Sequence, residues 1–431
     1  MKRLVVSLLA LVAFLTPVSL ARSAAVCTLD APAQPTSVTM IGWTFPILDY
    51  YAGQLKACGQ TKNLTVNVQI LASADAQEQM RLAFSSPGKS PYDIIHSDNT
   101  HIAEFAGQGV LLPLDDLIAK YKTQYKLDDI DKSLFAAGSV GGKVYGIPII
   151  VNTQHLYYNK AILAKARVEV PKTYDDVIKA CGVMFPKAKE LGIEHPFAMV
   201  LSAGWAWEIE WQNLLSAYGG TMLDATNKPI FNSKEGVAAV NKIMDLVKAC
   251  FGTTGLLMST DDVQAGIRNG SVAMAHMWAS RGNGMDDPKV SEQAGNIEYA
   301  PALYPSADIK VRSAIAWADF LAIPARSEVD KDLLFRMIME AAKPDTQLEA
   351  AKFGIPSRSS AVSAAPRNAD ASLKTIAEGG PANTNPALGL ANAALGEYLP
   401  KVATGELTAQ AALDAAAAKY LTEATAQKLI K

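Results

Sequence analysis

The chain has 431 residues, 49% of them apolar, and a formal net charge of −2. A balance this close to neutral excludes a protein that binds nucleic acid or another polyanion through a basic surface. The length exceeds the size at which one hydrophobic core usually keeps growing, which predicts two lobes, each with its own core.

The first 25 residues have the composition of a secretory signal peptide. Two basic residues precede an apolar run over residues 4–15, and small residues lead up to Ala25, where we expect cleavage. That run is too short to cross a bilayer, and no later stretch reaches the roughly 18 apolar residues of a spanning helix. Val26 stands where a lipoprotein signal needs a small residue before Cys27. We therefore expect a soluble protein exported to the periplasm, with 37 basic and 42 acidic side chains after cleavage.

Four cysteines remain after the signal peptide, and their spacing contains no CxxC or Cys/His pattern typical of zinc sites. We expect neither a metal nor a cofactor. In an oxidising compartment disulfides are expected, and four cysteines allow three connectivities. We favour Cys27 with Cys58 and Cys181 with Cys250, because each pair falls within one expected lobe.

The N-terminal part of the chain alternates strands and helices. An apolar strand over residues 37–42 ends at Trp43, and a buried strand over residues 92–96 leads to Asp98 and Asn99. In open α/β sheets, ligands collect outside the carboxyl ends of the strands. These strand ends are therefore candidate site loops, although Asp98 and Asn99 can equally cap the helix that follows.

Residues 145–163 change character twice, and we interpret them as a hinge. Residues 147–151 are apolar and suit a buried strand, while Asn152 begins a short polar run. Apolar character then returns. This pattern is typical of a segment that crosses between two lobes beside a solvent-filled cleft, and an ordinary strand and loop is the alternative.

Aromatic residues recur at strand ends in the second half of the chain. The strand expected over residues 197–201 leads to Trp205, Trp207 and Glu208 at the next helix start, and Trp278 ends a later strand. These positions again place side chains at the edge of a sheet where ligands collect.

The last expected strand, over residues 313–324, carries Trp317 and Asp319. Residues 361–386 are rich in Ala, Ser, Pro, Gly and Asn and predict a long surface excursion. Residues 387–430 return to helix, since their alanine run is helical by propensity.

Several segments, in order, resemble the family 1 extracellular solute-binding proteins of ABC importers, the relatives of the maltose-binding protein. They are SPYDIIHSDNTHIAEFAGQGVLLPLDDLI, GKVYGIPIIVNTQHLYYNKAIL, VPKTYDDVIKA, NGSVAM followed by Trp278, AWADFLAIPARS and FGIPSRSSA. The resemblance covers nearly the whole chain after the signal peptide. It implies an α/β, two-lobe periplasmic-binding-protein fold whose lobes close over a ligand by a hinge motion. It also implies a monomer that delivers its ligand to an ABC permease with a cytosolic ATPase.

The resemblance further implies three crossings between the lobes: one within residues 145–163, one near residues 296–304 and one after a helix that ends near Lys343. The expected division is residues 26–151 and 304–345 in the N-terminal lobe, and residues 152–303 and 346–431 in the C-terminal lobe.

A carbohydrate site needs flat aromatic faces for the C–H faces of a sugar and planar polar groups for its hydroxyls. The ligand-binding candidates lie at or near the expected cleft: Trp43, Asp98, Asn99, Asn152, Trp205, Trp207, Glu208, Trp278, Arg281, Trp317, Asp319 and Arg358. Core packing is the alternative for each tryptophan. We assign Trp211, four residues after Trp207 on the same helix, to the core.

The polar candidates bear on the kind of ligand. Asn152 occupies the hinge position at which the maltose-binding relatives carry an acidic contact, which argues against a maltodextrin. Arg358 can pair with the ligand or with Asp319, since an unpaired buried carboxylate is costly. We favour a neutral mono- or oligosaccharide or a polyol. Arg281 and Arg358 keep an acidic or sulfonated sugar as the second choice, because a guanidinium can bind such a group bidentately.

The sequence contains no GxSxG, P-loop, GxGxxG or HExxH motif, and we expect no enzyme. The best alternative from another class is a secreted glycosidase with Glu208 and Asp319 as its carboxylate pair. His96 and His101 flank a loop but lack the third ligand of a zinc site. A peptide-binding protein is a further alternative that the residues leave open.

Overall fold

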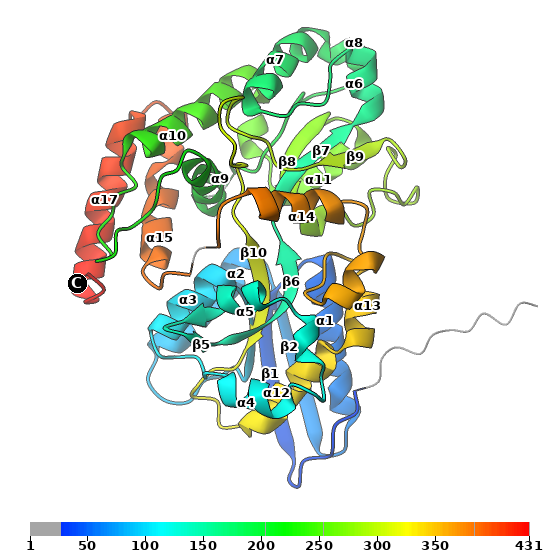
Figure 1. Cartoon of the computed structure of the whole chain (residues 1–431), viewed down its shortest axis with the longest axis vertical. Coiled ribbons are helices and arrows are strands. Elements are labelled where there is room, and N and C mark those ends of the chain that lie inside the picture. Colours follow the sequence, from blue (N-terminus) through cyan, green and yellow to red (C-terminus); the bar gives the residue numbers. More distant parts are fainter. Residues whose placement is uncertain (1–26, 203, 253, 383, 431) are drawn as a thin grey trace, which may run out of the picture.

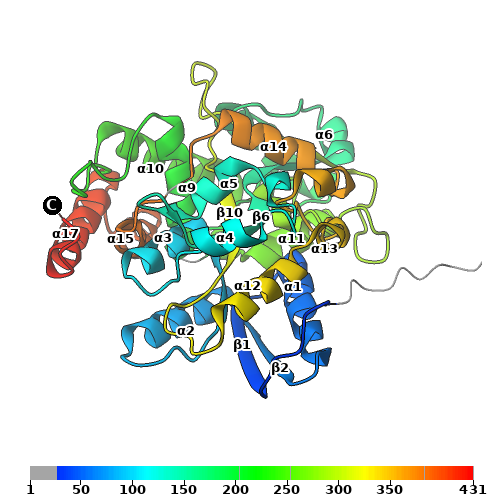
Figure 2. The same ribbon diagram turned by 60° about the horizontal axis from the view of Figure 1, so that its bottom comes forward.

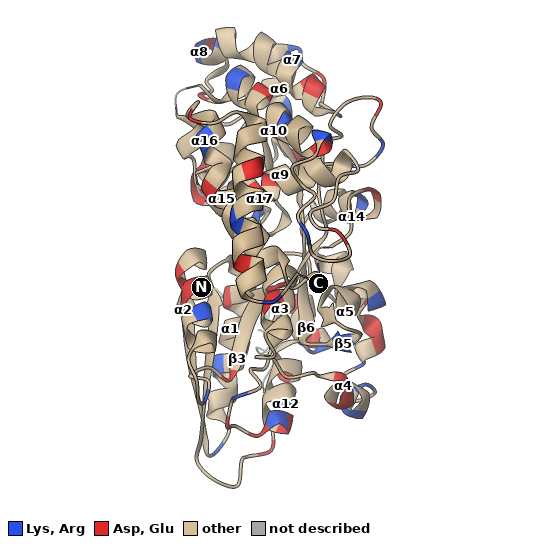
Figure 3. Cartoon of the chain, turned by 90° about the vertical axis from the view of Figure 1, so that its left-hand side faces the viewer, with Lys and Arg blue, Asp and Glu red and all other residues tan. Residues whose placement is uncertain are grey.

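A computed structural model describes residues 27–202, 204–252, 254–382 and 384–430, which form the two lobes seen one above the other in Figure 1. The expected signal peptide, residues 1–25, lies outside the described residues. Within those ranges, none of the helices combines the length and the apolar character needed to span a bilayer. Figure 3 shows acidic and basic positions interspersed over the helices of both lobes.

A five-stranded sheet of order β2-β1-β3-β10-β6 forms the centre of the N-terminal lobe. Its strands are β1 Thr36–Trp43, β2 Leu64–Leu71, β3 Ile94–Asp98, β6 Gly146–Asn152 and β10 Trp317–Ala322. β1 pairs in parallel with β2 and β3, whereas β10 pairs antiparallel with β3 and β6. Every residue of β6 is buried, which explains its nearly continuous apolar sequence.

Helices cover both faces of this sheet: α1 Pro46–Ala57, α2 Ser73–Ser85, α3 Asn99–Gly107, α4 Asp115–Tyr121, α5 Lys132–Ala137, α12 Lys331–Ala341 and α13 Pro344–Ala350. A short hairpin, β4 Ser139–Val140 and β5 Lys143–Val144, precedes β6. Side chains alternate along the strands, so Met40 packs in the core under α1 and α12 while Ile41 packs with α2 and α3. Figure 2 shows α1 and α2 on opposite sides of β1 and β2.

The C-terminal lobe contains an antiparallel sheet of order β8-β7-β9, formed by β7 Gln154–Asn159, β8 Met274–Trp278 and β9 Ile297–Ala300. Its helices are α6 Lys160–Ala166, α7 Tyr174–Met184, α8 Ala188–Leu191, α9 Gly204–Ala217, α10 Lys234–Leu246, α11 Thr260–Asn269, α14 Ala369–Glu378, α15 Leu388–Tyr398, α16 Pro400–Ala403 and α17 Ala409–Ala426. Thr173 and Asp176 form a capping box at the start of α7.

Two expected elements differ in the structure. The strand expected over residues 197–201 is absent, because this segment meets β8 only through isolated bridges such as Ala198–Ala275. The expected surface excursion over residues 361–386 contains α14, whose Ala371, Ser372 and Thr375 are buried against the C-terminal lobe. Composition alone predicted a loop there, but small residues also allow a helix to pack closely.

The first crossing between the lobes runs from β6 to β7 through Thr153, inside the expected hinge stretch. The second crossing is not near residues 296–304. Leu303 belongs to the C-terminal core, and the carbonyl of Tyr304 accepts a hydrogen bond from the backbone of Tyr174. The chain crosses instead just before β10, where the carbonyl of Ile315 accepts a hydrogen bond from the Thr153 hydroxyl at 3.1 Å. The two crossings therefore lie side by side.

The third crossing also lies later than expected. Ala350 belongs to the N-terminal core, and the backbone N–H of Ser360 still donates to Asp129 in that lobe at 2.9 Å. We therefore propose moving the division of the chain to residues 27–152 and 317–360 for the N-terminal lobe, with the other described residues forming the C-terminal lobe.

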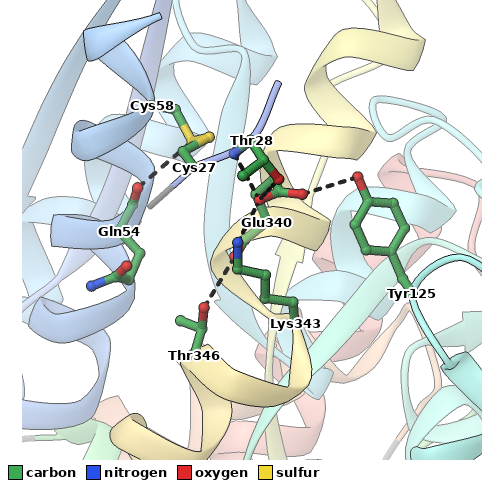
Figure 4. Close-up of a disulfide and its surroundings, with 8 residues drawn as sticks. All are labelled: Cys27, Thr28, Gln54, Cys58, Tyr125, Glu340, Lys343 and Thr346. Carbon is green, nitrogen blue, oxygen red and sulfur yellow. Dashed lines mark hydrogen bonds and ion pairs between the residues drawn. A yellow bond between two sulfur atoms is a disulfide. The ribbon is translucent and has the colours of Figure 1, made fainter. Parts of the chain in front are cut away.

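The structure contains two disulfides in the pairing favoured from the sequence, Cys27–Cys58 and Cys181–Cys250. Figure 4 shows that Thr28, next to Cys27, points at Glu340 of α12. The backbone N–H and the hydroxyl of Thr28 both donate to Glu340 Oε2, at 3.0 and 3.1 Å. The disulfide and this carboxylate together hold the chain near residue 27 against α1 and α12.

Replacing both Cys181 and Cys250 by alanine should lower the free energy of unfolding by about 2–4 kcal/mol, and slightly more than the same change at Cys27 and Cys58. Cys181 and Cys250 are 69 positions apart, whereas Cys27 and Cys58 are 31 positions apart. The disulfide that closes the longer loop restricts the unfolded chain more. Urea unfolding of the two double variants measures both values. Equal midpoints for the wild type and the variant without Cys181–Cys250 would contradict a stabilising role for this bond.

Candidate functional site

A cavity of about 160 Å³ lies between the lobes, at the edge of the N-terminal sheet. Eight of the twelve sequence candidates line it: Trp43, Asp98, Asn152, Trp205, Trp278, Arg281, Trp317 and Asp319. Thr44 and Phe45, in the candidate loop after the first strand, also line the cavity. The lining residues that sequence reasoning missed are Ser73, Gln77, Ile209, Thr260 and Ser280. Ser73 and Gln77 follow the carboxyl end of β2, so the same rule of strand ends would have found them.

Strand register brings the N-terminal candidates together. β1 ends at Trp43 and β3 ends at Asp98, while the antiparallel β10 begins at Trp317 on the same edge of the sheet. Asp319 pairs with Asp98 across β3 and β10, and Trp317 pairs with Asn152 across β10 and β6. Residues more than 200 positions apart thus meet at one edge.

Aromatic rings form much of the cavity wall. Trp278 and Trp317 meet edge to face, with ring centroids 5.8 Å apart, and Trp43 packs on the His96 ring at 4.2 Å. Trp205, at the start of α9, leaves 38% of its surface exposed. Trp317 is almost buried, and its indole N–H has no hydrogen-bond partner among the described residues. The cavity wall therefore contains the exposed ring of Trp205 and a buried indole N–H without a partner among the described residues.

A buried histidine holds Asp319. His96 Nε2 lies 3.1 Å from Asp319 Oδ1, and Nδ1 of the same ring is buried without a partner among the described residues. Burial raises the pKa of Asp319 and outweighs the opposing effect of His96.

A second histidine holds Asp98. The Asp98 side chain caps α3 by accepting from the backbone of His101 at 3.0 Å, and it also accepts from His101 Nδ1 at 2.9 Å. Burial opposes ionisation of Asp98, but His101 outweighs it and lowers the pKa of this carboxyl. Asp98 is therefore both a helix cap and a residue of the cavity wall.

A second cavity of about 240 Å³ adjoins the first and shares Gln77, Asp98, Trp205, Ile209 and Trp317 with it. It extends between α2 and α3 of one lobe and α9 and α15 of the other.

Polar side chains line this extension. Arg81 forms two hydrogen bonds with Glu104, both 3.2 Å, and donates to His101 Nε2 at 3.1 Å. Glu208 lines this cavity and not the first one. Its side chain accepts a hydrogen bond from Gln212, and burial raises the pKa of Glu208 well above its usual value.

Asn99 and Trp207, two of the sequence candidates, line neither cavity. Asn99 is fully buried, and its side-chain oxygen accepts from the backbone of Ala318 at 3.2 Å. Trp207 is only 2% exposed and belongs to the C-terminal core. It follows Trp205 by two residues, about 200° around the helix, so the two rings point to opposite sides. Trp211 lies in the same core, as expected.

Arg358 is also not in the cavity. Its side chain is fully buried in the N-terminal lobe and donates to the carbonyls of Ala342, Lys126 and Tyr125, at 2.8, 2.9 and 2.9 Å. Its nearest carboxylate is Asp129, at 3.8 Å, so the expected pair with Asp319 is absent. A guanidinium has five donors and satisfies several carbonyls at once, which explains its position in the interior.

Comparison with known proteins agrees with this two-lobe arrangement. The family model of the bacterial extracellular solute-binding proteins matches residues 47–332. The chain belongs to this family. It is 21% identical over 272 residues to a binding protein of Brucella abortus (strain 2308), a match that covers 62% of this chain and 63% of that protein. It is 25% identical over 199 residues to the multiple sugar-binding protein of Streptococcus mutans, covering 44% and 43%. The solute-binding protein thus spans less than two thirds of the length of these curated relatives.

Solved structures share the fold over almost the whole solute-binding protein. The solute-binding protein of Agrobacterium radiobacter K84 in complex with ribitol is 19% identical and superposes with a TM-score of 0.78, covering 91% of this chain and 100% of that one. The solute-binding protein of Agrobacterium vitis S4 with bound D-mannitol is 20% identical, with a TM-score of 0.77 and coverage of 91% and 99%. These likenesses establish the two-lobe periplasmic-binding-protein fold.

Proposed function

We propose that this protein captures a small carbohydrate, meaning a mono- or oligosaccharide or a polyol, in the cavity between its lobes and delivers it to an ABC permease. The observation that carries the proposal is the convergence of Trp43, Trp205, Trp278 and Trp317 with several planar polar groups in one interlobe cavity. The ribitol and D-mannitol complexes of two proteins with the same fold are consistent with a ligand of this class. Export through a signal peptide at residues 1–25, and action as a periplasmic monomer, belong to the same proposal.

Each wall of the cavity has a role in this proposal. The open face of Trp205 and the paired rings of Trp278 and Trp317 cover the C–H faces of the sugar, since aromatic rings bury a large area at low entropic cost. Asp98, Asp319 and Asn152 bind its hydroxyl groups. Asp98, Asn152 and Asp319 belong to the N-terminal lobe, whereas Trp205 and Trp278 belong to the C-terminal lobe. A sugar that contacts both sets therefore favours the closed arrangement of the lobes.

The alternatives have less support. Arg358 is absent from the cavity and Arg281 is bound to Asp261 at 2.6 Å, which leaves little free positive charge for an acidic or sulfonated sugar. The carboxyl groups of Glu208 and Asp319 line different cavities rather than flanking one, as a glycosidase would require. We therefore propose a binding protein without enzymatic turnover.

A thermal-shift panel should give a higher melting temperature with a hexose, an oligosaccharide or a polyol. A ligand at about 100 times its dissociation constant stabilises the folded state by about 2.7 kcal/mol. Uronic acids, amino acids and short peptides serve as the comparison set. Stabilisation by amino acids or peptides alone would overturn the carbohydrate proposal, and hydrolysis of an added oligosaccharide would favour the glycosidase.

A further inference from the structure

The acidic side chains of the cavity lie next to one another. Asp98 and Asp319 are direct partners across β3 and β10, and side chains at such positions are about 5 Å apart on the same face of the sheet. Like charges placed directly opposite each other destabilise a sheet. Among the described residues, neither carboxylate forms an ion pair with a lysine or an arginine. The fold therefore keeps two adjacent acids at the site whose direct partners are histidines.

Each of these acids has one histidine as its direct partner. His96 Nε2 lies 3.1 Å from Asp319 Oδ1, and the buried Nδ1 of the same ring has no partner among the described residues. Burial and the nearby Arg81 oppose charge on His101, but Asp98 outweighs them and the pKa of His101 is raised. His101 therefore balances part of the charge of Asp98, whereas Asp319 faces His96 alone.

The arginines of the two cavities are engaged elsewhere. Arg81 is bound bidentately by Glu104, and Arg281 is bound by Asp261 at the surface. Among the described residues, the basic side chains that line the two cavities are Arg81, Arg281 and His101. Glu208 adds a third buried carboxyl group close to Asp98. Across both cavities, the acidic side chains therefore outnumber the arginines that are not already bound to a carboxylate.

Two independent features of the same cavity indicate what would balance these acids. The tryptophan rings that suit a sugar also attract a cation to their faces. The indole N–H of Trp317, buried and without a partner among the described residues, requires an acceptor oxygen such as a hydroxyl or a ring oxygen. A ligand with both a cationic group and sugar oxygens would satisfy the acids, the rings and this donor together.

We propose that the carbohydrate carried by this protein is an amino sugar, whose ammonium group lies between Asp98 and Asp319. The inference rests on the proposed function and narrows its ligand class. The ammonium relieves the repulsion between the two carboxylates, while the sugar ring lies against the tryptophans and accepts the Trp317 N–H.

Proton release on binding is a consequence that a neutral sugar would not share. Burial raises the pKa of Asp319, and burial followed by the hydrogen bond from Gln212 and the charge of Asp98 leaves the pKa of Glu208 well above its usual value. A bound ammonium favours the ionised form of both groups. Binding then releases protons, so affinity for the amino sugar falls as the pH is lowered. The groups that act on Asp319 are His96 and Asp98, and the groups that act on Glu208 are Gln212 and Asp98.

Isothermal titration calorimetry on the mature protein tests the proposal with matched pairs. D-glucosamine, D-galactosamine and D-mannosamine are each compared with the parent hexose, at a pH where the amine is protonated. At least one amine should bind roughly ten-fold or more tightly than its parent, a difference of about 1.4 kcal/mol. Its binding heat should also depend on the ionisation enthalpy of the buffer, as expected for proton release.

Asp98→Asn and Asp319→Asn keep the shape of the site and should bring the amine-to-parent affinity ratio close to one. Asp116→Asn on the exposed side of α4 removes an equal charge far from the cleft and should leave the ratio unchanged.

Parent hexoses or polyols that bind as well as or better than every amine would overturn this inference and leave the proposed function intact. Failure of all sugars, together with no stabilisation in the thermal-shift panel, would overturn both. A selectivity for amines that survives both substitutions would overturn the placement of the ammonium.

Discussion

Replacing Arg358 by methionine should lower the free energy of unfolding by about 3–5 kcal/mol, without changing the ligand affinity of the protein that remains folded. The guanidinium satisfies the carbonyls of Ala342, Lys126 and Tyr125 in a fully buried position. Methionine fills a similar volume but leaves these three acceptors without a donor, and each unsatisfied buried group costs about 1–3 kcal/mol. Urea unfolding measures the loss, and calorimetry at low temperature measures the affinity.

Arg358→Lys is the matched control for this prediction. Lysine keeps the charge, but its single ammonium group cannot reach all three carbonyls as the planar guanidinium does. Arg358→Lys should therefore recover only part of the stability that Arg358→Met loses. Full stability of the methionine variant would show that the buried hydrogen bonds contribute little. A large loss of affinity in a stable variant would instead return Arg358 to the binding site.

The role of Arg358 in the interior of the N-terminal lobe could not be predicted from the sequence. The motif that contains it pointed to a functional arginine, but its hydrogen-bond partners, Tyr125 and Lys126, lie more than 230 positions earlier in the chain. A charged residue near an expected cleft suggests a ligand contact. Only tertiary structure shows that backbone carbonyls from two other segments surround it.

Strand ends, in contrast, were predictable. Trp43 and Asp98 end the parallel strands β1 and β3, so both must lie at the same edge of the sheet. The rule needs only the order of apolar strands and the first polar or aromatic residue after each. Trp317 reaches the same edge because it begins the antiparallel β10, which the strand expected over residues 313–324 did not indicate. It does not apply within a helix, where successive residues point in different directions, so it does not separate Trp205 in the cavity wall from Trp207 in the core.

The crossings between the lobes were located less well than the strands. The chain keeps to the C-terminal lobe until Ile315, because Leu303 and Tyr304 are anchored there by packing and by a backbone hydrogen bond. An apolar strand pattern does not indicate which of two cores it joins. The first crossing was predictable because polar residues interrupt the apolar pattern of residues 145–163 at the hinge itself.

Two tryptophans that lie two positions apart on α9 should have different roles. Trp205→Ala should weaken ligand binding, whereas Trp207→Ala should lower the stability of the fold. Trp205 is 38% exposed in the cavity wall, so its loss should weaken ligand binding by about 2 kcal/mol, roughly thirty-fold, while changing stability by about 1 kcal/mol or less. Trp207 is 2% exposed in the C-terminal core, so its truncation should cost about 3–5 kcal/mol of unfolding free energy. Both variants are measured by urea unfolding and by calorimetry with whichever sugar stabilises the wild type.

Trp207→Phe is the control for size, since it retains an aromatic ring in the core and should restore part of the stability lost in Trp207→Ala. The ligand affinity of this variant should equal that of the wild type, because Trp207 lines neither cavity. Weaker binding by Trp207→Phe with unchanged stability would mean that this ring reaches the ligand in the closed form of the protein. Unchanged affinity in Trp205→Ala would remove the exposed ring from the sugar site and leave Trp278 and Trp317 as its aromatic wall.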